Sequence, residues 1–175
     1  MFHDLPPIVV WLANVGGLAG MPILISLLFI RLPDRYFTQD GGMTKLLAFE
    51  RSGKWYERTL AIHRWKNRLP DGGAWLKGGF HKKRLSTRDN SYMKQFELET
   101  RRGEWAHWCM LLVTPIFMLW NEGWSAFIVL VYALAANLPC IFVQRYNRAR
   151  FIRLMFRRGE ICYAKEMKSA SMEEL

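Results

Sequence analysis

Charged side chains are missing from three long stretches of this 175-residue sequence. Residues 5–30, 108–121 and 123–144 contain no Asp, Glu, Lys, Arg or His. The first and third stretches exceed the roughly 20 apolar residues that an α-helix needs to cross a bilayer. These runs exclude an ordinary soluble domain and a disordered tail, and they predict membrane-crossing helices.

Cysteine is also scarce. The three cysteines, Cys109, Cys140 and Cys162, lie far apart, and the sequence contains no CxxC pair. This spacing indicates neither the disulfide framework of a small secreted protein nor a structural zinc site. We interpret the cysteines as reduced thiols that take part in packing.

Basic residues are confined to two blocks of the chain. Residues 31–104 hold 17 Lys and Arg against 9 acids, a net charge of +8, and residues 145–175 hold 8 against 4, a net charge of +4. By the positive-inside rule both blocks are cytoplasmic, which predicts three crossings with the N-terminus outside and the C-terminus in the cytoplasm. The first apolar run lacks a basic leader and an A-x-A-like cleavage site, so we interpret it as a retained span.

The predicted fold is a single all-α integral membrane domain over residues 1–175. Its expected parts are spans at about 5–30, 105–121 and 123–144, a cytoplasmic interfacial segment at 31–104 and a cytoplasmic tail at 145–175. One long helix is expected to resume near Ser91 and to run through Glu104 into the second span. A basic amphipathic helix on the bilayer surface is predicted from apolar residues that recur at steps of three and four, namely Leu46, Phe49, Gly53, Tyr56 and Leu60.

One imidazole in the predicted second helix has carboxylates on the same side. Glu104 precedes His107 by three residues, and Glu99 lies about 80° away around the helix. This pattern is typical of a general base, His107, oriented by Glu104 or Glu99. The alternative is that these groups satisfy helix ends or pair with Arg102.

A hairpin between the second and third spans predicts which polar groups meet. If the chain turns at Glu122, residues at equal distances from the turn lie at similar depth in the membrane. Glu99 is then level with Arg145, and His107 with Asn137. We therefore expect an ion pair between Glu99 and Arg145 and a contact between His107 and Asn137.

The ExxH spacing of Glu104 and His107 also occurs in carboxylate-bridged di-metal bundles. Those sites use the motif twice and add further Glu ligands, whereas it occurs once here. No metal is therefore expected, and a metal-dependent lipid-modifying enzyme is kept as an alternative.

A second candidate pair is His63 and Asp71, separated by the turn-forming sequence Leu69-Pro70-Asp71-Gly72-Gly73. The turn could bring the two side chains together as an alternative dyad. The His-x4-Asp acyltransferase spacing is not present, and a basic, aromatic surface helix explains the residues equally well.

A third candidate region ends the last span with amide and guanidinium groups. Its members are Asn137, Gln144, Arg145, Asn147 and Arg148. Such donors could hold an anionic or sugar headgroup. An ordinary positive-inside flank needs only charge and does not explain the amides.

Three strings, IHRWKNRLPDGG, ETRRGEWAHW and ANLPCIFVQRYNRAR, together resemble the glycosyl-4,4'-diaponeurosporenoate acyltransferase family of staphyloxanthin-type carotenoid synthesis. The resemblance runs from about Phe49 to Arg150. It implies a multi-pass enzyme of the bacterial inner membrane that transfers a fatty acyl chain to a hydroxyl of a glycosylated carotenoid or similar glycolipid. The donor would be a thioester, acyl-CoA or acyl carrier protein, with no bound cofactor. The expected partners are the bilayer, the acceptor lipid and the donor, and no nucleic acid.

This reaction gives the candidate residues roles in one pocket at the inner rim of the bilayer. His107 is the expected base and Glu104 its orienting partner, with His63 and Asp71 as the alternative dyad. The expected substrate-binding residues are Glu99, Arg102, Asn137, Gln144, Arg145, Asn147 and Arg148, among which Arg102, Asn137 and Arg145 would stabilise the oxyanion. A non-enzymatic lipid-binding or assembly subunit is the remaining alternative.

Overall fold

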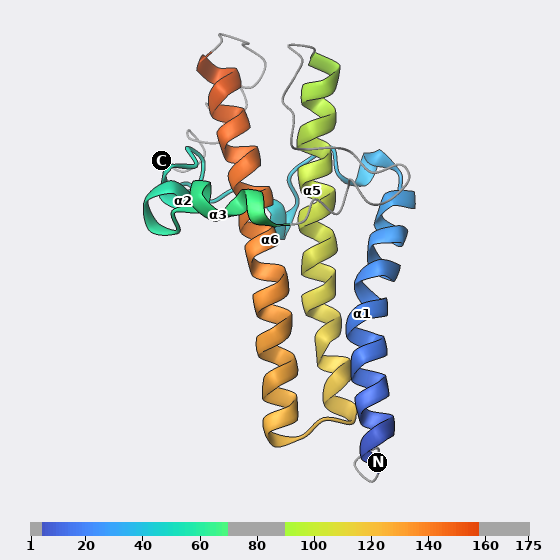
Figure 1. The fold of residues 1–175 in the computed structure, drawn as a ribbon. Coiled ribbons are helices and arrows are strands. Elements are labelled where there is room, and N and C mark those ends of the chain that lie inside the picture. The colour runs from blue at the N-terminus through green and yellow to red at the C-terminus, as the bar shows by residue number, and fades with distance from the viewer. Residues whose placement is uncertain (1–4, 70–89, 158–175) are drawn as a thin grey trace.

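Three long helices lie side by side in the structure, a computed structural model that describes residues 5–69 and 90–157 (Figure 1). They are α1 (Pro7–Arg31), α5 (Asn90–Val113) and α6 (Gly123–Arg157). Helix α5 contacts both of the others. The described residues contain helices and no strand, so the predicted all-α class is confirmed.

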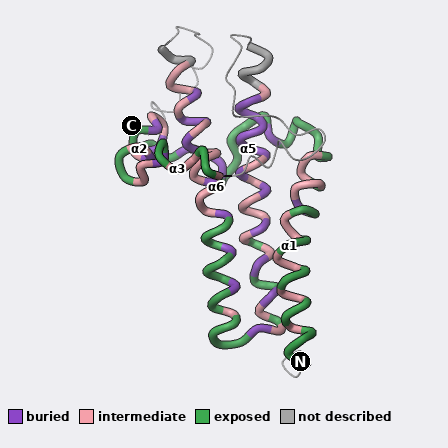
Figure 2. The backbone as a smooth tube through the Cα atoms, in the orientation of Figure 1, coloured by how far each residue is buried: buried purple, intermediate pink, exposed green. Residues whose placement is uncertain are grey.

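Helices α1 and α6 are long and apolar enough to cross a membrane. Their most apolar windows are only 6% and 22% buried, whereas the core helix of a soluble protein is mostly buried. Exposed residues follow the lower parts of both helices (Figure 2). Many of them are large and apolar, and Trp124 at the start of α6 is 79% exposed. Burial in lipid explains such an apolar surface, so the structure supports membrane association.

The expected long helix ahead of the second apolar stretch is confirmed as α5. Its apolar part is divided, because the chain continues after Val113 as the 3-10 helix η4 (Thr114–Leu119), which has Pro115 in its first turn. Helix α6 continues through Pro139 to Arg157. The residues predicted to begin a cytoplasmic tail at 145 are therefore still helical.

The predicted amphipathic helix is much shorter than expected, which corrects the sequence interpretation. Residues 48–52 form turns, and within residues 46–60 only α2 (Lys54–Thr59) is helical. Gly53 has a left-handed φ of 69°, and the Glu50 carboxylate accepts the backbone N–H of Leu47 at 2.7 Å, so this stretch of chain turns instead of coiling. The remaining elements of the segment are η1 (Asp34–Tyr36), η2 (Gly42–Thr44), α3 (Ile62–Trp65) and η3 (Lys66–Arg68).

An amide clamp fastens α1 to the end of η4. The Asn14 oxygen accepts the Asn121 amide and the Trp120 indole N–H, each at 2.8 Å, and the Asn14 amide donates to the Asn121 oxygen at 2.9 Å. Asn14 is a polar residue inside an apolar run, and this reciprocal pairing satisfies its amide group.

Close packing of α1 on η4 gives a stability prediction. A Cβ on Gly17 would lie 2.7 Å from Cζ of Phe117, while a Cβ on Gly16 would meet nothing within 4 Å. We expect Gly17→Ala to destabilise the protein by about 1–3 kcal/mol, because the buried Phe117 ring must shift. Thermal unfolding of the detergent-solubilised protein measures the effect, with Gly16→Ala as the matched control. Equal unfolding midpoints for the two variants would contradict the packing.

Candidate functional site

Arg145 is the centre of a buried ion network between α5, α6 and the interfacial segment. Its Nη1 donates to Glu104 Oε1 at 2.6 Å, and its Nε and Nη2 donate to the two Glu50 oxygens at 3.0 and 2.5 Å. Nη1 and Nη2 also donate to the backbone carbonyls of Met43 and Lys45, each at 2.9 Å. All five N–H donors of the guanidinium are therefore engaged. Arg145 positions the three segments relative to one another.

Glu104 is shared between two guanidinium groups. Its second carboxylate oxygen accepts from Nη2 of Arg148 at 2.8 Å, and its first also lies 3.4 Å from the Trp108 indole nitrogen. Arg148 is fully buried and also donates to the Thr44 carbonyl. In Figure 2 the buried residues of α5 and α6 concentrate in the upper part of the helix pair.

The predicted pair of Glu99 and Arg145 is wrong. Glu99 binds Arg102 and Gln95 instead, while Arg145 binds Glu104 and Glu50. The six residues of η4 rise about 12 Å as a 3-10 helix, against about 9 Å in an α-helix. Counted back from the turn at Glu122, fewer residues of η4 and α5 are then needed to reach the level of Arg145. The arginine side chain also leans toward the turn, because side chains tilt toward the N-terminus of their helix.

Sequence reasoning missed the acidic partners of these arginines. Residues 31–69 contain four acids, and each binds an arginine of α5 or α6. The pairs are Asp34 with Arg102, Asp40 with Arg101, Glu50 with Arg145 and Glu57 with Arg153. Isolated carboxylates in a strongly basic segment were the available signal, since such groups need partners at a membrane surface.

The Glu50 carboxylate is held in its ionised form. Burial raises its pKa, but hydrogen bonds from Arg145, from the Tyr56 hydroxyl at 2.5 Å and from the Leu47 backbone outweigh burial and lower the pKa below 4.5. Burial and the bond to Glu50 raise the pKa of Tyr56 in turn. The phenol therefore remains a donor, and Glu50 is bound as an anion.

Acid should weaken this part of the structure. Since the folded pKa of Glu50 is lowered, its contribution to stability is present above pH 4.5 and is lost as the pH falls through the folded value. We expect the difference in unfolding midpoint between the wild type and Glu50→Gln to narrow as the pH falls below 4.5. Thermal unfolding in detergent between pH 7 and about pH 3 measures this difference. A difference in unfolding midpoint that stays constant or widens in acid would contradict an ionised Glu50.

The predicted contact between His107 and Asn137 is confirmed. Nδ1 of His107 lies 2.9 Å from Oδ1 of Asn137, whose amide nitrogen donates to the Ala133 carbonyl at 2.9 Å. The amide oxygen therefore faces the ring, and Nδ1–H is the donor. In the neutral imidazole this tautomer has its lone pair on Nε2, the form that a general base requires. Because Glu104 is bound by Arg145 and Arg148, the residue that orients the imidazole is Asn137.

The other expected site residues are more scattered. His63 is exposed on α3, and Asp71 lies outside the described residues, so the structure does not describe this dyad. Gln144 is half-buried on α6, and the Asn147 oxygen accepts Nζ of Lys66 at 3.4 Å. Within residues 5–69 and 90–157, no group of three or more His, Cys, Asp or Glu side chains could hold a metal ion.

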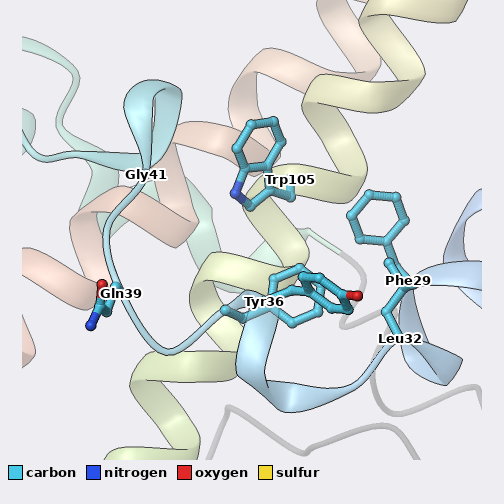
Figure 3. A pocket seen from close by; sticks show the side chains of 7 residues that line it. Phe29, Leu32, Tyr36, Gln39, Gly41 and Trp105 are labelled. Carbon is cyan, nitrogen blue, oxygen red and sulfur yellow. The ribbon is translucent and has the colours of Figure 1, made fainter.

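An apolar hollow of about 370 Å³ lies at the C-terminal end of α1 (Figure 3). It is lined by Phe29, Leu32, Tyr36, Phe37, Gln39, Gly41 and Trp105, a set that includes none of the expected site residues. Trp105 and His107 point about 160° apart around α5. The hollow suits a hydrocarbon chain, but it lies on the opposite face from His107. This hollow is therefore not the expected pocket of the candidate residues.

The three strings singled out in the sequence meet around residues 145–148 of α6. Arg145 joins the last string to Glu104 of the second. Lys66 of the first string contacts Asn147 and lies with its Nζ 5.0 Å from the Tyr146 ring centroid. Segments about 40 and 80 residues apart in the sequence therefore form one polar region beside residues 145–148 of α6.

Comparison with known proteins identifies similar chains. The family model described as "Glycosyl-4,4'-diaponeurosporenoate acyltransferase" matches residues 33–157. Curated relatives with that name from Staphylococcus aureus strains bovine RF122 / ET3-1, USA300 and MRSA252 are each 35% identical over 141 residues. The alignments cover 78% of this chain and 84% of each relative. No solved structure matches the chain.

Proposed function

Because this chain belongs to the glycosyl-4,4'-diaponeurosporenoate acyltransferase family, we propose that it transfers a fatty acyl group from a thioester donor to a hydroxyl of a glycosylated carotenoid or similar glycolipid. Family membership makes the chain an acyltransferase, and the proposal adds the donor, the acceptor and the site. The observation that carries it is the bond between His107 and Asn137, which sets the imidazole in the tautomer of a general base.

We place the reaction at the cytoplasmic face of the bacterial inner membrane. In this proposal α1, the apolar end of α5 with η4, and α6 make three crossings, with the N-terminus outside and the C-terminus in the cytoplasm. The contacts of η4 with α5 and α6 support a helical hairpin through the apolar zone. The basic residues begin at the opposite end of the hairpin, which agrees with the positive-inside rule.

The proposed chemistry is a single acyl transfer. Nε2 of His107 takes the proton from the acceptor hydroxyl as its oxygen attacks the thioester carbonyl. The tetrahedral intermediate then collapses, the C–S bond breaks, and the imidazolium returns the proton to the thiolate, so the products are an ester and a free thiol. Asn137 orients the base throughout. Gln144, two helical turns along the same face of α6, is the proposed amide contact for the sugar.

The direct test is the lipid product. A bacterial host that makes the glycosylated carotenoid is grown with and without this chain, and its lipids are compared by mass spectrometry. We expect a species heavier by one fatty acyl group only in cells that contain the chain in the membrane. Isolated membranes given the acceptor with and without acyl-CoA or acyl carrier protein then identify the donor. Unchanged lipids in every arm would overturn the proposal in favour of a non-enzymatic role.

A further inference from the structure

A cluster of cations lies where η3 meets α6. Nζ of Lys66 lies 3.4 Å from the Asn147 oxygen and 5.0 Å from the Tyr146 ring centroid. Arg150 follows Tyr146 by one helical turn, and Arg153 follows three residues later, so both extend the same face of α6. The side chains of Lys66, Asn147, Arg150 and Arg153 are partly exposed, so a ligand can reach them from solvent.

The carboxylate of Glu57 contacts this cluster. Oε1 of Glu57 accepts the Tyr146 hydroxyl at 3.0 Å and Nη2 of Arg153 at 3.4 Å. Glu57 is the only acid between residues 54 and 69, where five Lys and Arg occur. Among the residues that the structure describes, the three cations Lys66, Arg150 and Arg153 share the one carboxylate of Glu57, so this part of the surface carries an excess of positive charge.

The pKa of Lys66 responds to the positive charge around it. Burial of its ammonium group, and then the charge of Arg150, lower the pKa of Lys66. Like charges held at short range and partly removed from water favour an anion that can bind between them. The Asn147 amide adds a neutral donor to the cluster. Its oxygen accepts from Lys66, and its N–H groups are donors.

We propose that Lys66, Asn147 and Arg150 bind a phosphate ester at the cytoplasmic surface. Lysine supplies a compact ammonium and arginine a planar fork of N–H groups, both of which form charge-assisted hydrogen bonds with phosphate oxygens. Two sources carry this chemistry: the nucleotide part of a thioester donor such as coenzyme A, and the headgroup of an anionic phospholipid. The first source rests on the proposed function, whereas the site itself does not.

Binding measurements on the purified full chain in detergent test the proposal. The probes are coenzyme A, and vesicles of phosphatidylglycerol compared with phosphatidylcholine. We expect one of the phosphate probes to bind the wild type in a salt-sensitive way. Lys66→Gln and Arg150→Gln should each weaken binding about tenfold or more, the loss of one charge-assisted hydrogen bond. Lys66→Arg should retain most of the affinity, and Lys54→Gln, on the exposed start of α2, is the matched control.

The outcomes separate the source of the phosphate from the existence of the site. Coenzyme A binding that depends on Lys66 and Arg150 assigns the site to the acyl donor, and phosphatidylglycerol binding with the same dependence assigns it to lipid. Binding of neither probe, or equal losses in Lys66→Gln and Lys54→Gln, would overturn the site. Acyl transfer that persists in those cases would leave the proposed function intact.

Discussion

Replacing Arg145 by methionine should leave little folded protein. The substitution removes all five guanidinium bonds and leaves Glu50 and Glu104 as buried carboxylates, each 5% exposed or less. Breaking a buried ion pair by removal of one partner costs about 3–5 kcal/mol. We expect a large fall in the thermal unfolding midpoint, or loss of the monodisperse peak in size-exclusion chromatography of the detergent extract.

The matched control for this prediction is Arg153→Met on the same helix. Its ion pair with Glu57 spans 3.4 Å, and the two side chains are 21% and 35% exposed, so its loss should cost about 1 kcal/mol or less. A second test adds Glu50→Gln to Arg145→Met. The added substitution neutralises one of the two carboxylates that have lost Arg145 and should restore part of the stability. Equal stability of the Arg145 and Arg153 variants would contradict a structural role for the network.

Replacing His107 by alanine should abolish acyl transfer without unfolding the protein. Loss of a general base slows a reaction by about 10²–10⁴-fold. His107 is only partly buried and contacts the Asn137 amide, whereas Arg145 is the buried centre of an ion network, so the cost to stability should be small compared with that of Arg145→Met. The measurement is the rate of ester formation by isolated membranes, with thermal unfolding of each variant as the check on folding.

Substitutions around His107 identify the base. Asn137→Ala removes the oriented amide and should lower the rate less than His107→Ala, because the imidazole remains. His63→Ala should leave the rate near that of the wild type, since His63 is exposed on α3. Full activity of His107→Ala together with inactivity of His63→Ala would transfer the role of base to the dyad of His63 and Asp71.

The long helices were accessible from sequence because long runs of apolar residues act locally. The runs at 5–30 and 123–144 became α1 and α6, and the continuous helix before the second apolar stretch became α5. The predicted surface helix at 46–60 failed, although its period correctly selected the buried residues Leu46 and Tyr56. A turn around Glu50 and the left-handed backbone of Gly53 prevent a continuous helix there.

Partner choice in the site was only partly accessible. The hairpin argument found the contact of His107 with Asn137 but misassigned the partner of Arg145, whose long side chain leans toward the turn and reaches Glu104. The partners Asp40 and Glu50 come from the segment between α1 and α5. No periodic pattern in its sequence predicts how that segment runs over the helices.

The distribution of charge along the chain by itself determined that this protein has long apolar helices followed by basic segments, because the hydration of charged residues keeps them out of an apolar run that can lie in a bilayer. Only the tertiary structure decided which carboxylate meets which guanidinium and which face of α5 carries the imidazole. Those contacts depend on the rise and rotation of each helix and on the route of the connecting segment. They are properties of several segments packed together, so no single stretch of sequence specifies them.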